Sequence, residues 1–453
     1  MGAIEVNLTL RRGPVASLAR RAGGPVLVFA IAFLGYYLSN SRPLDWYNFL
    51  TDAILRGDLH HVREPLDWYK HYVYLAVAIT QGTLDVASVG IPDFYRDLVV
   101  DGTSKYLPFQ PAPAVLLVPF VAVWGSSFSE VYFSMALGAI NVALVWYLLG
   151  LLNVSRTTKL LLVPFFAFGT AHFYAATTGT LWFYNHVAAV FFLLLSIIFL
   201  LRRTSPVVPA FFLALAFLSR QSTILATPFF IYWMIRQRHP SIFSREALFN
   251  RKSLMQAGLF VGTLLPFILF SLWYNQIRFG SPFDTGLSTL YEGYGGIPYS
   301  FYLSQFPEAT RFDMFDVRNI PLHLYTIFLM PPELHPGKWG LPIPQPSPYG
   351  MSVLLSSPAL IYAAFVKRDD PLKLGSWMAI GLVSIPLITY FNQGWVQFGY
   401  RFLLDFIPFL LILTALGFED NQTPVSMRIK LLLVAVAIVA GFWGRYWGTE
   451  LGW

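Results

Sequence analysis

The sequence contains no cysteine and few charged side chains. None of its 453 residues is cysteine, and only 12% are Asp, Glu, Lys or Arg. The absence of cysteine excludes a disulfide framework, thiolate catalysis, zinc–thiolate sites and iron–sulfur clusters. The low charge argues against an ordinary water-soluble domain, in which about 25% of residues are charged. A Walker loop, a Gly-x-Gly-x-x-Gly fingerprint and a His-Glu-x-x-His motif are also missing, which argues against a nucleotide-driven pump and an intramembrane zinc protease.

In place of charge, the chain has long apolar runs. Hydrophobic residues make up 56% of the chain and aromatic residues 17%. A helix needs about 17 to 25 mostly apolar residues to cross a bilayer, so the sequence predicts an all-α polytopic membrane protein of about 11 transmembrane helices, within a range of roughly 10 to 12. The net charge of +7 is spread over the loops, which favours a lipid bilayer as partner and no nucleic acid. The predicted spans are residues 23–40, 111–125, 129–152, 159–178, 184–202, 206–235, 254–275, 350–366, 373–391, 400–417 and 428–447.

The distribution of Lys and Arg predicts the orientation. Arg11, Arg12, Arg20 and Arg21 precede the first apolar run, which indicates a retained signal anchor with a cytoplasmic N-terminus. The alternatives left open are whether 111–125 spans or only dips into the membrane, and whether 206–235 is one bent helix or a hairpin. The predicted organisation is a cytoplasmic N-terminus at 1–22, a first transmembrane helix at 23–40, an external catalytic loop with interfacial helices at 41–110, a transmembrane bundle at 111–275, a second large external loop at 276–349 and C-terminal transmembrane helices at 350–453.

The first external loop contains a short internal repeat. Leu-Asp-Trp-Tyr occurs at 44–47 and again at 66–69, and each copy leads into a segment with apolar residues at helical spacing. Each copy is therefore expected to form a helix that lies on the membrane plane. Asp45 and Asp67 fall at or just before these helix starts, where an N-cap would explain them as well as a catalytic role.

Several segments resemble landmarks of a known superfamily. They are DWYKHYVYLAVAITQGTLDV, GTSKYLPFQPAPAVLLVPFVAVWG, GTLWFYNHVAAVFF, LSRQSTILATPFF, FGSPFDTG and QFGYRFLLDFIPFLLIL. Together with the signal anchor and the two external loops, they resemble the GT-C superfamily of bacterial integral membrane glycosyltransferases, which use polyprenyl-phosphate sugars. One departure is that an adjacent acidic pair is absent, and Lys70 stands where an acid is expected.

The resemblance implies a function. The chain is expected to transfer a hexosyl or pentosyl group, with inversion, from a polyprenyl-phosphate donor to a hydroxyl of a glycan, lipid or protein acceptor. The reaction is expected on the external face of the plasma membrane, in cell-envelope synthesis. The alternative is a transporter or flippase for a lipid-linked or small polar solute. No large internal repeat is found, and most charges lie in the loops, which favours the enzyme.

Such a transfer needs a carboxylate to accept the proton of the attacking hydroxyl. Asp67 and Asp45 are ranked nearly equal as this base, followed by Glu64, Asp97 and Asp101.

The departing phosphate needs cations or hydrogen-bond donors. Arg401 ranks high because it starts a predicted span, although a structural i,i+4 pair with Asp405 would also explain it. Arg220 is intramembrane if 206–235 is one helix, and a turn residue if it is a hairpin. His186 has either a structural or a direct role. The full set of candidates for binding the donor phosphate or substrate is Arg401, Lys105, Arg63, Lys70, Arg220, His186, Tyr400 and Lys338.

No cofactor is required by these patterns. His60 and His61, with Asp58 and Glu64 nearby, leave a divalent metal as an alternative, but adjacent His residues on a helix point in different directions.

Overall fold

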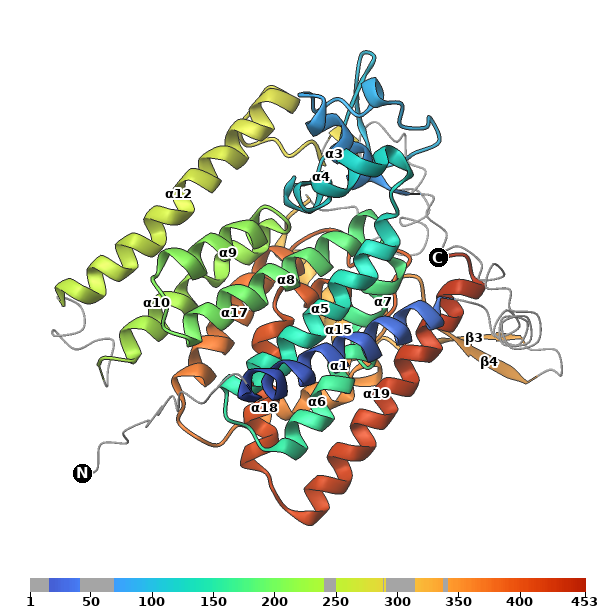
Figure 1. Cartoon of the computed structure of the whole chain (residues 1–453). Coiled ribbons are helices and arrows are strands. Elements are labelled where there is room, and N and C mark those ends of the chain that lie inside the picture. The colour runs from blue at the N-terminus through green and yellow to red at the C-terminus, as the bar shows by residue number, and fades with distance from the viewer. Residues whose placement is uncertain (1–15, 41–68, 240–249, 288, 291–313, 337–340) are drawn as a thin grey trace.

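The chain folds into a bundle of helices with two short hairpins (Figure 1). The computed structural model describes residues 16–40, 69–239, 250–287, 289–290, 314–336 and 341–453. The prediction of a mainly helical chain is confirmed, whereas the hairpins were not predicted. The α-helices are α1 (Ala16–Ser39), α3 (His71–Thr80), α4 (Ala112–Trp124), α5 (Glu130–Leu151), α6 (Arg156–Phe168), α7 (Ala171–Thr178), α8 (Leu181–Leu201), α9 (Val207–Phe217), α10 (Thr227–Arg236), α12 (Arg251–Phe279), α15 (Ile320–Phe328), α16 (Val353–Ser356), α17 (Pro371–Ile388), α18 (Ile407–Asp420) and α19 (Pro424–Glu450).

Short 3₁₀ helices and strands connect these helices. The 3₁₀ helices are η1 (Ala87–Val89), η2 (Gly125–Ser127), η3 (Gln221–Ala226), η4 (Val317–Asn319), η5 (Pro358–Phe365) and η6 (Arg401–Asp405). Strands β1 (Val99–Asp101) and β2 (Ser104–Tyr106) pair antiparallel, with Val99 opposite Tyr106. Strands β3 (Glu333–Pro336) and β4 (Pro342–Gln345) form a second antiparallel pair, with Glu333 opposite Gln345.

Five helices in the described part of the chain are long and apolar enough to cross a membrane, namely α5, α8, α12, α17 and α19. The pair α6 and α7, bent by 45°, makes a sixth if it forms one span. The predicted first span corresponds to α1, which counts as a shorter apolar helix over Gly23–Ser39. The remaining predicted spans correspond to shorter elements; residues 350–366, for example, contain the four-residue α16 and the 3₁₀ helix η5. The expected number of about eleven spans is therefore not confirmed.

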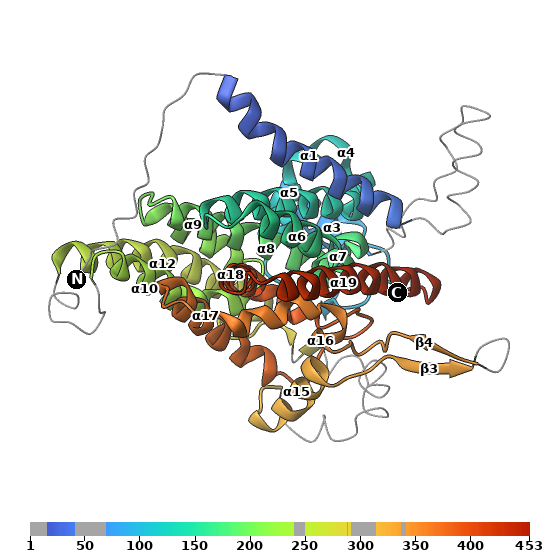
Figure 2. The same ribbon diagram turned by 90° about the horizontal axis from the view of Figure 1, so that it is seen from below.

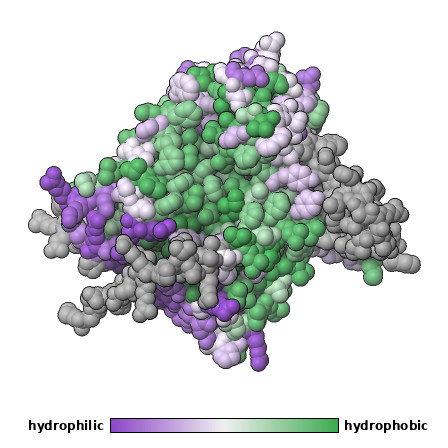
Figure 3. Space-filling model, viewed as in Figure 1, coloured by the Kyte–Doolittle hydropathy of each residue, from purple (hydrophilic) through white to green (hydrophobic). Residues whose placement is uncertain are grey.

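The helices differ in how deeply they lie in the bundle. In the most apolar part of α8, 78% of the residues are buried, whereas the corresponding shares are 17% for α12 and 22% for α19. Figures 1 and 2 show α12 and α19 along the outside of the bundle. Leu265, Leu269 and Trp273 of α12 are more than half exposed. The space-filling view shows an apolar surface across the middle of the molecule (Figure 3). Because such a surface is unfavourable in water, it is the face of a membrane protein that meets lipid.

The predicted span 206–235 is interrupted. Helices α9 and α10 are separated by η3, and Arg220 at the junction has an extended backbone, with φ −141° and ψ 107°. The run 206–235 therefore forms two short helices joined by a 3₁₀ segment and not one uninterrupted helix. The break places the Arg220 side chain at the end of α9, where it can reach a neighbouring element.

The N-terminus of helix α3 is capped by a carboxylate from another helix. Its N-cap residue, Lys70, makes no capping hydrogen bond through its side chain. Glu130, at the start of α5 and fully buried, instead accepts hydrogen bonds from the backbone N–H groups of Tyr72 at 3.0 Å and Val73 at 3.2 Å. Negative charge is favourable at a helix N-terminus, so Glu130 fixes α3 against the bundle. Asp67 and the first copy of the repeat lie outside the described residues.

The end of α12 is tied to the first loop by Arg278. Its guanidinium donates to the carbonyl oxygens of Leu107 and Phe109, and its side chain is 4% exposed. The Arg278 guanidinium carbon also lies 3.5 Å from the centre of the Tyr274 ring. The C-terminal end of α12 and the end of the first loop therefore lie on the same side of the molecule.

Replacing Glu130 by alanine is expected to destabilise the chain. The variant leaves the N–H groups of Tyr72 and Val73 without their acceptor, which costs about 1 to 3 kcal/mol for buried donors. Glu333→Ala is the matched control, because Glu333 pairs with His335 at 3.2 Å with both side chains about half exposed, at 45% and 46%. An exposed pair contributes about 0 to 1 kcal/mol. Unfolding in detergent measures both variants, and equal losses would contradict the role given to Glu130.

Candidate functional site

A buried carboxylate, Asp405, joins three segments that are far apart in the sequence. Its Oδ1 accepts a hydrogen bond from Nδ1 of His186 in α8 at 2.8 Å. Nε of Arg220 donates to both carboxylate oxygens, at 3.0 and 3.2 Å, and the hydroxyl of Ser222 donates to Oδ2 at 2.5 Å. Asp405 is fully buried, and Arg220 is 19% exposed. Buried charges persist when they are paired and hydrogen-bonded, as they are in this cluster.

The alternative of an Arg401–Asp405 pair is wrong. Residues Arg401–Asp405 form the 3₁₀ helix η6, in which side chains three apart, rather than four apart, share a face. The Asp405 carboxylate therefore turns inward to Arg220 and His186, and Arg401 has other contacts.

Arg401 is held by a tightly turned loop. Its Nη1 donates to the carbonyl oxygen of Trp395 at 3.2 Å, and its backbone N–H donates to Oε1 of Gln397 at 3.3 Å. Val396 has φ 51°, a left-handed conformation that is unfavourable for a β-branched residue. Because such conformations persist only where the surroundings enforce them, this loop is built to place Arg401 and Trp395.

The ring of Phe402 lies between the cationic side chains. The guanidinium carbons of Arg220 and Arg401 are 5.6 and 5.5 Å from its centre. The rings of His186 and Tyr400 are 6.1 and 5.7 Å from it, centre to centre. Four of the predicted site residues therefore surround one aromatic ring.

Tyr400 is connected to the second external loop through His323. Nε2 of His323 lies 2.7 Å from the carbonyl oxygen of Tyr390, and Nδ1 lies 2.9 Å from the Tyr400 hydroxyl. Burial lowers the pKa of His323 to about 4, so the ring is neutral at neutral pH. A carbonyl can only accept, so Nε2 carries the proton and Nδ1 accepts from Tyr400.

Asp97 is a first-loop residue whose carboxyl has a raised pKa. It is partly buried, and its backbone is left-handed, with φ 59°. Burial raises the pKa of Asp97 to about 7, while the charges of Arg401 and Arg96 act in the opposite direction. The ring of His71 holds this segment in place, since its Nε2 donates to the carbonyl oxygen of Arg96 at 2.7 Å. Asp97 and Arg401 therefore interact electrostatically, although 304 positions separate them in the sequence.

Other candidates have different environments. Lys105 pairs with the exposed Asp93 at 2.7 Å, and Asp101 is exposed at the turn between β1 and β2. Lys70 donates to the carbonyl oxygen of Ser126 at 3.2 Å. Neither of these two contacts joins the cluster around Phe402. The candidates Asp45, Glu64, Asp67, Arg63 and Lys338 lie outside the described residues.

Metal binding stays an untested alternative. No group of three or more His, Asp or Glu residues suited to a metal occurs in the part of the chain that the structure describes. Asp58, His60 and His61 lie outside that part.

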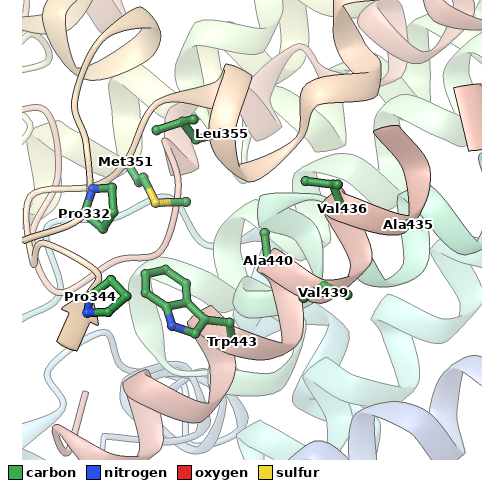
Figure 4. Close-up of a pocket in the computed structure, with 9 residues that line it drawn as sticks. All are labelled: Pro332, Pro344, Met351, Leu355, Ala435, Val436, Val439, Ala440 and Trp443. Atoms are coloured by element: carbon green, nitrogen blue, oxygen red, sulfur yellow. The ribbon is translucent and has the colours of Figure 1, made fainter. Parts of the chain in front are cut away.

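An apolar pocket lies on the outer side of α19. Its volume is about 510 Å³, and it extends from α19 to the segments around β3, β4 and α16 (Figure 4). Its lining comprises Pro332, Pro344, Met351, Leu355, Ala435, Val436, Val439, Ala440 and Trp443. A pocket with this lining suits a hydrocarbon chain.

Several residues of the site were missed by sequence reasoning. Ser222 follows Arg220 by two positions, and only the extended backbone at Arg220 brings both side chains to Asp405. Trp395 contributes a backbone oxygen, for which no side-chain pattern exists. The turn Asn-Gln-Gly-Trp at 392–395 next to Arg401 was the one available signal.

Comparisons with known proteins give a distant likeness among solved structures. No protein-family model and no curated protein matches the chain. Among solved structures, the chain is similar to the archaeal oligosaccharyltransferase AglB from Archaeoglobus fulgidus, determined in complex with an inhibitory peptide and a dolichol-phosphate, at 13% identity and a TM-score of 0.46. The match covers 94% of this chain and 56% of AglB, so the chain spans little more than half the length of that protein. A likeness at this level determines neither family nor activity.

Replacing Asp405 by asparagine is expected to destabilise the chain strongly. The variant leaves the Arg220 guanidinium buried without its counter-charge, and removing one partner of a buried ion pair costs about 3 to 5 kcal/mol. Asp93→Asn is the matched control, because it removes one partner of an exposed pair whose contribution is about 0 to 1 kcal/mol. Unfolding of both variants in the same detergent gives the comparison. If Asp405→Asn were as stable as the control, the cluster would not hold the bundle together.

Proposed function

We propose that the chain is a membrane glycosyltransferase. It moves a hexosyl or pentosyl group from a polyprenyl-phosphate donor to an acceptor hydroxyl, with inversion, on the external face of the plasma membrane. The acceptor is a glycan, lipid or protein. The observation that carries the proposal is a first-loop carboxyl, Asp97, whose pKa is raised to about 7 beside the guanidinium of Arg401.

The pairing of these two groups matches the needs of the reaction. The acceptor oxygen attacks the anomeric carbon as its proton passes to a carboxylate, and the bond from that carbon to the phosphate oxygen breaks with its electron pair on the phosphate. A base is most effective when its pKa lies near the working pH, as that of Asp97 does. A guanidinium suits the departing phosphate because its N–H groups match two oxygens at once.

The base is assigned to Asp97 among the described residues. Asp45 and Asp67 remain the other candidates, because their repeated Leu-Asp-Trp-Tyr motif lies in the same loop. Arg401 is assigned to the phosphate. Arg220 and His186 are assigned to positioning, since both are engaged by Asp405.

The lipid part of the donor accounts for the placement of this site. Asp97 belongs to a loop that α3 and Glu130 fix to apolar helices, and Arg401 directly follows a turn at the start of η6. A donor with its chain in the bilayer and its phosphate at the interface would meet both groups.

Asp97→Asn is expected to reduce transfer at least about 100-fold, since general bases typically contribute 10²–10⁴. The assay uses the purified chain in lipid, with polyprenyl-phosphate donors that carry radiolabelled hexose or pentose and with membrane acceptors. Asp101→Asn is the control and is expected to keep full activity, because Asp101 is exposed at the hairpin turn. Full activity of Asp97→Asn together with inactive Asp45→Asn or Asp67→Asn would move the base to the repeat. Movement of the labelled lipid across vesicles with its sugar unchanged would favour a flippase and overturn the proposal.

The pH dependence of transfer gives an independent test. Asp97 has to be ionised to accept a proton, so the rate at low substrate concentration is expected to fall as the pH drops below about 7. Because the charge of Arg401 lowers the pKa of Asp97, Arg401→Gln is expected to move this acidic limb to higher pH. The residual activity of the variant, measured from pH 5 to 9, reports the shift. A limb that stays in place, or moves to lower pH, would separate Arg401 from the base.

A further inference from the structure

A second buried arginine, Arg445, lies near the C-terminal end of α19. Its side chain is 6% exposed, and it lies on the buried face of the helix between Gly444 and Gly448. No Asp or Glu in the part of the chain that the structure describes forms an ion pair with it. An ionisable residue within a membrane-spanning segment is costly, and it marks a functional site by default.

The neighbours of Arg445 are neutral. Its Nη2 donates to Oδ1 of Asn40, the residue after α1, and its Nη1 lies 3.5 Å from the hydroxyl of Thr178 at the end of α7. Three helix ends therefore meet at this guanidinium, and each supplies at most one neutral oxygen. Within the described residues, no carboxylate pairs with this positive charge.

Two buried donors in this cluster have no acceptor among the described residues. They are Nε of Arg445 and Nδ2 of Asn40. The orientation of the Asn40 amide is set by Arg445, because a guanidinium can only donate and the amide oxygen must face it. Buried polar groups are nearly always hydrogen-bonded, so a donor-rich cluster without acceptors calls for a ligand that accepts.

Tyr174 connects Arg445 with Arg401. The charges of both guanidinium groups act on the Tyr174 hydroxyl. The Tyr174 ring packs on α19 at Gly448, where a Cβ atom would lie 2.8 Å from it. The ring of Phe183 lies 5.5 Å from the Tyr174 ring and 5.4 Å from the Arg401 guanidinium carbon. Arg401 thus contacts this aromatic pair at Phe183, and the charge of Arg445 acts on it at Tyr174.

We propose that Arg445, with Asn40 and Thr178, binds the phosphate of a polyprenyl lipid, as a second cation beside Arg401. The proposal rests on the proposed function, because Arg401 is there assigned to the donor phosphate. A phosphate supplies several acceptor oxygens and negative charge, which meet the two unpaired donors and the uncompensated guanidinium. The apolar pocket that includes Trp443 lies on another face of the same helix, so a lipid chain would pass around α19 from the phosphate to the pocket (Figure 4).

Binding of sugar-free polyprenyl phosphate to the purified full chain tests the proposal without any transfer reaction. Native mass spectrometry in detergent measures its affinity, with inorganic phosphate and phosphatidylglycerol as competitors. Arg445→Gln keeps a hydrogen-bonding side chain and loses the charge, and it is expected to weaken binding at least about tenfold, since hydrogen bonds between charged partners are about twice as strong as neutral ones. Arg428→Gln is the control on the exposed surface of the same helix and is expected to bind like the original chain.

A second variant distinguishes loss of lipid binding from loss of folding. Asn40→Asp places a carboxylate against the Arg445 guanidinium, where it neutralises the charge that the phosphate would otherwise meet. The variant is therefore expected to raise stability and to reduce lipid binding. Unchanged affinity in Arg445→Gln with reduced stability would make Arg445 a structural tie and overturn the proposal. Equal affinity for phosphatidylglycerol would overturn the assignment to a polyprenyl lipid, and displacement by inorganic phosphate at similar concentration would do the same. If Arg445-dependent binding is found but no sugar is transferred, the proposed function fails and the phosphate site stands.

Discussion

The buried carboxylate of Asp405 is the interaction on which the arrangement of the site depends. It accepts hydrogen bonds from α8, from the residue that separates α9 from η3, and from the start of η3. Arg220 and Ser222 reach Asp405 because α9 ends before them and the backbone at Arg220 is extended, whereas His186 reaches it from within the continuous helix α8. Burial of an ion pair contributes little to stability by itself, but loss of one partner is expensive, so the cluster enforces one packing of these segments. The break at Arg220 and the 3₁₀ helix η6 therefore meet at this one carboxylate.

The same cluster also positions parts of the first and second loops, through the residues that precede Asp405 in the sequence. Phe402 follows Arg401 in the short helix that ends at Asp405, and its ring contacts both Arg220 and Arg401. Tyr400, on the other side of Arg401, donates to His323 in the second loop. The position of η6 thus determines where Arg401 meets the first-loop carboxyl of Asp97. A structural interaction in the bundle and the chemistry proposed at the interface are coupled through five consecutive residues.

The sequence predicted the long helices well and their interruptions poorly. The runs at 129–152, 184–202 and 254–275 correspond to α5, α8 and α12, because a continuous apolar run has few alternatives to a helix in lipid. The runs at 206–235 and 400–417 are also apolar, but Arg220 in the first pairs with Asp405 in the second, and this tertiary contact overrides the local pattern. For the site, residue type alone identified Arg220, His186, Arg401 and Asp97 as candidates. Their pairing, across separations of 185 and 219 positions for Asp405, has no local signal.

Arg220 and Arg401 differ in how far nearby carboxylates neutralise their charge, and this difference suits them to different roles. Arg220 shares its charge with Asp405 through two short contacts, which leaves little attraction for a substrate anion. Arg401 lowers the pKa of Asp97 and so makes it a weaker base while the site is empty. A phosphate that binds to Arg401 would reduce this effect and add its own negative charge, and both changes raise the pKa of Asp97. By thermodynamic reciprocity, protonation of Asp97 would strengthen phosphate binding by the same factor. The donor would therefore increase the strength of the base that its own transfer requires, and the pKa that governs the rate at saturating donor would lie above that of the free enzyme.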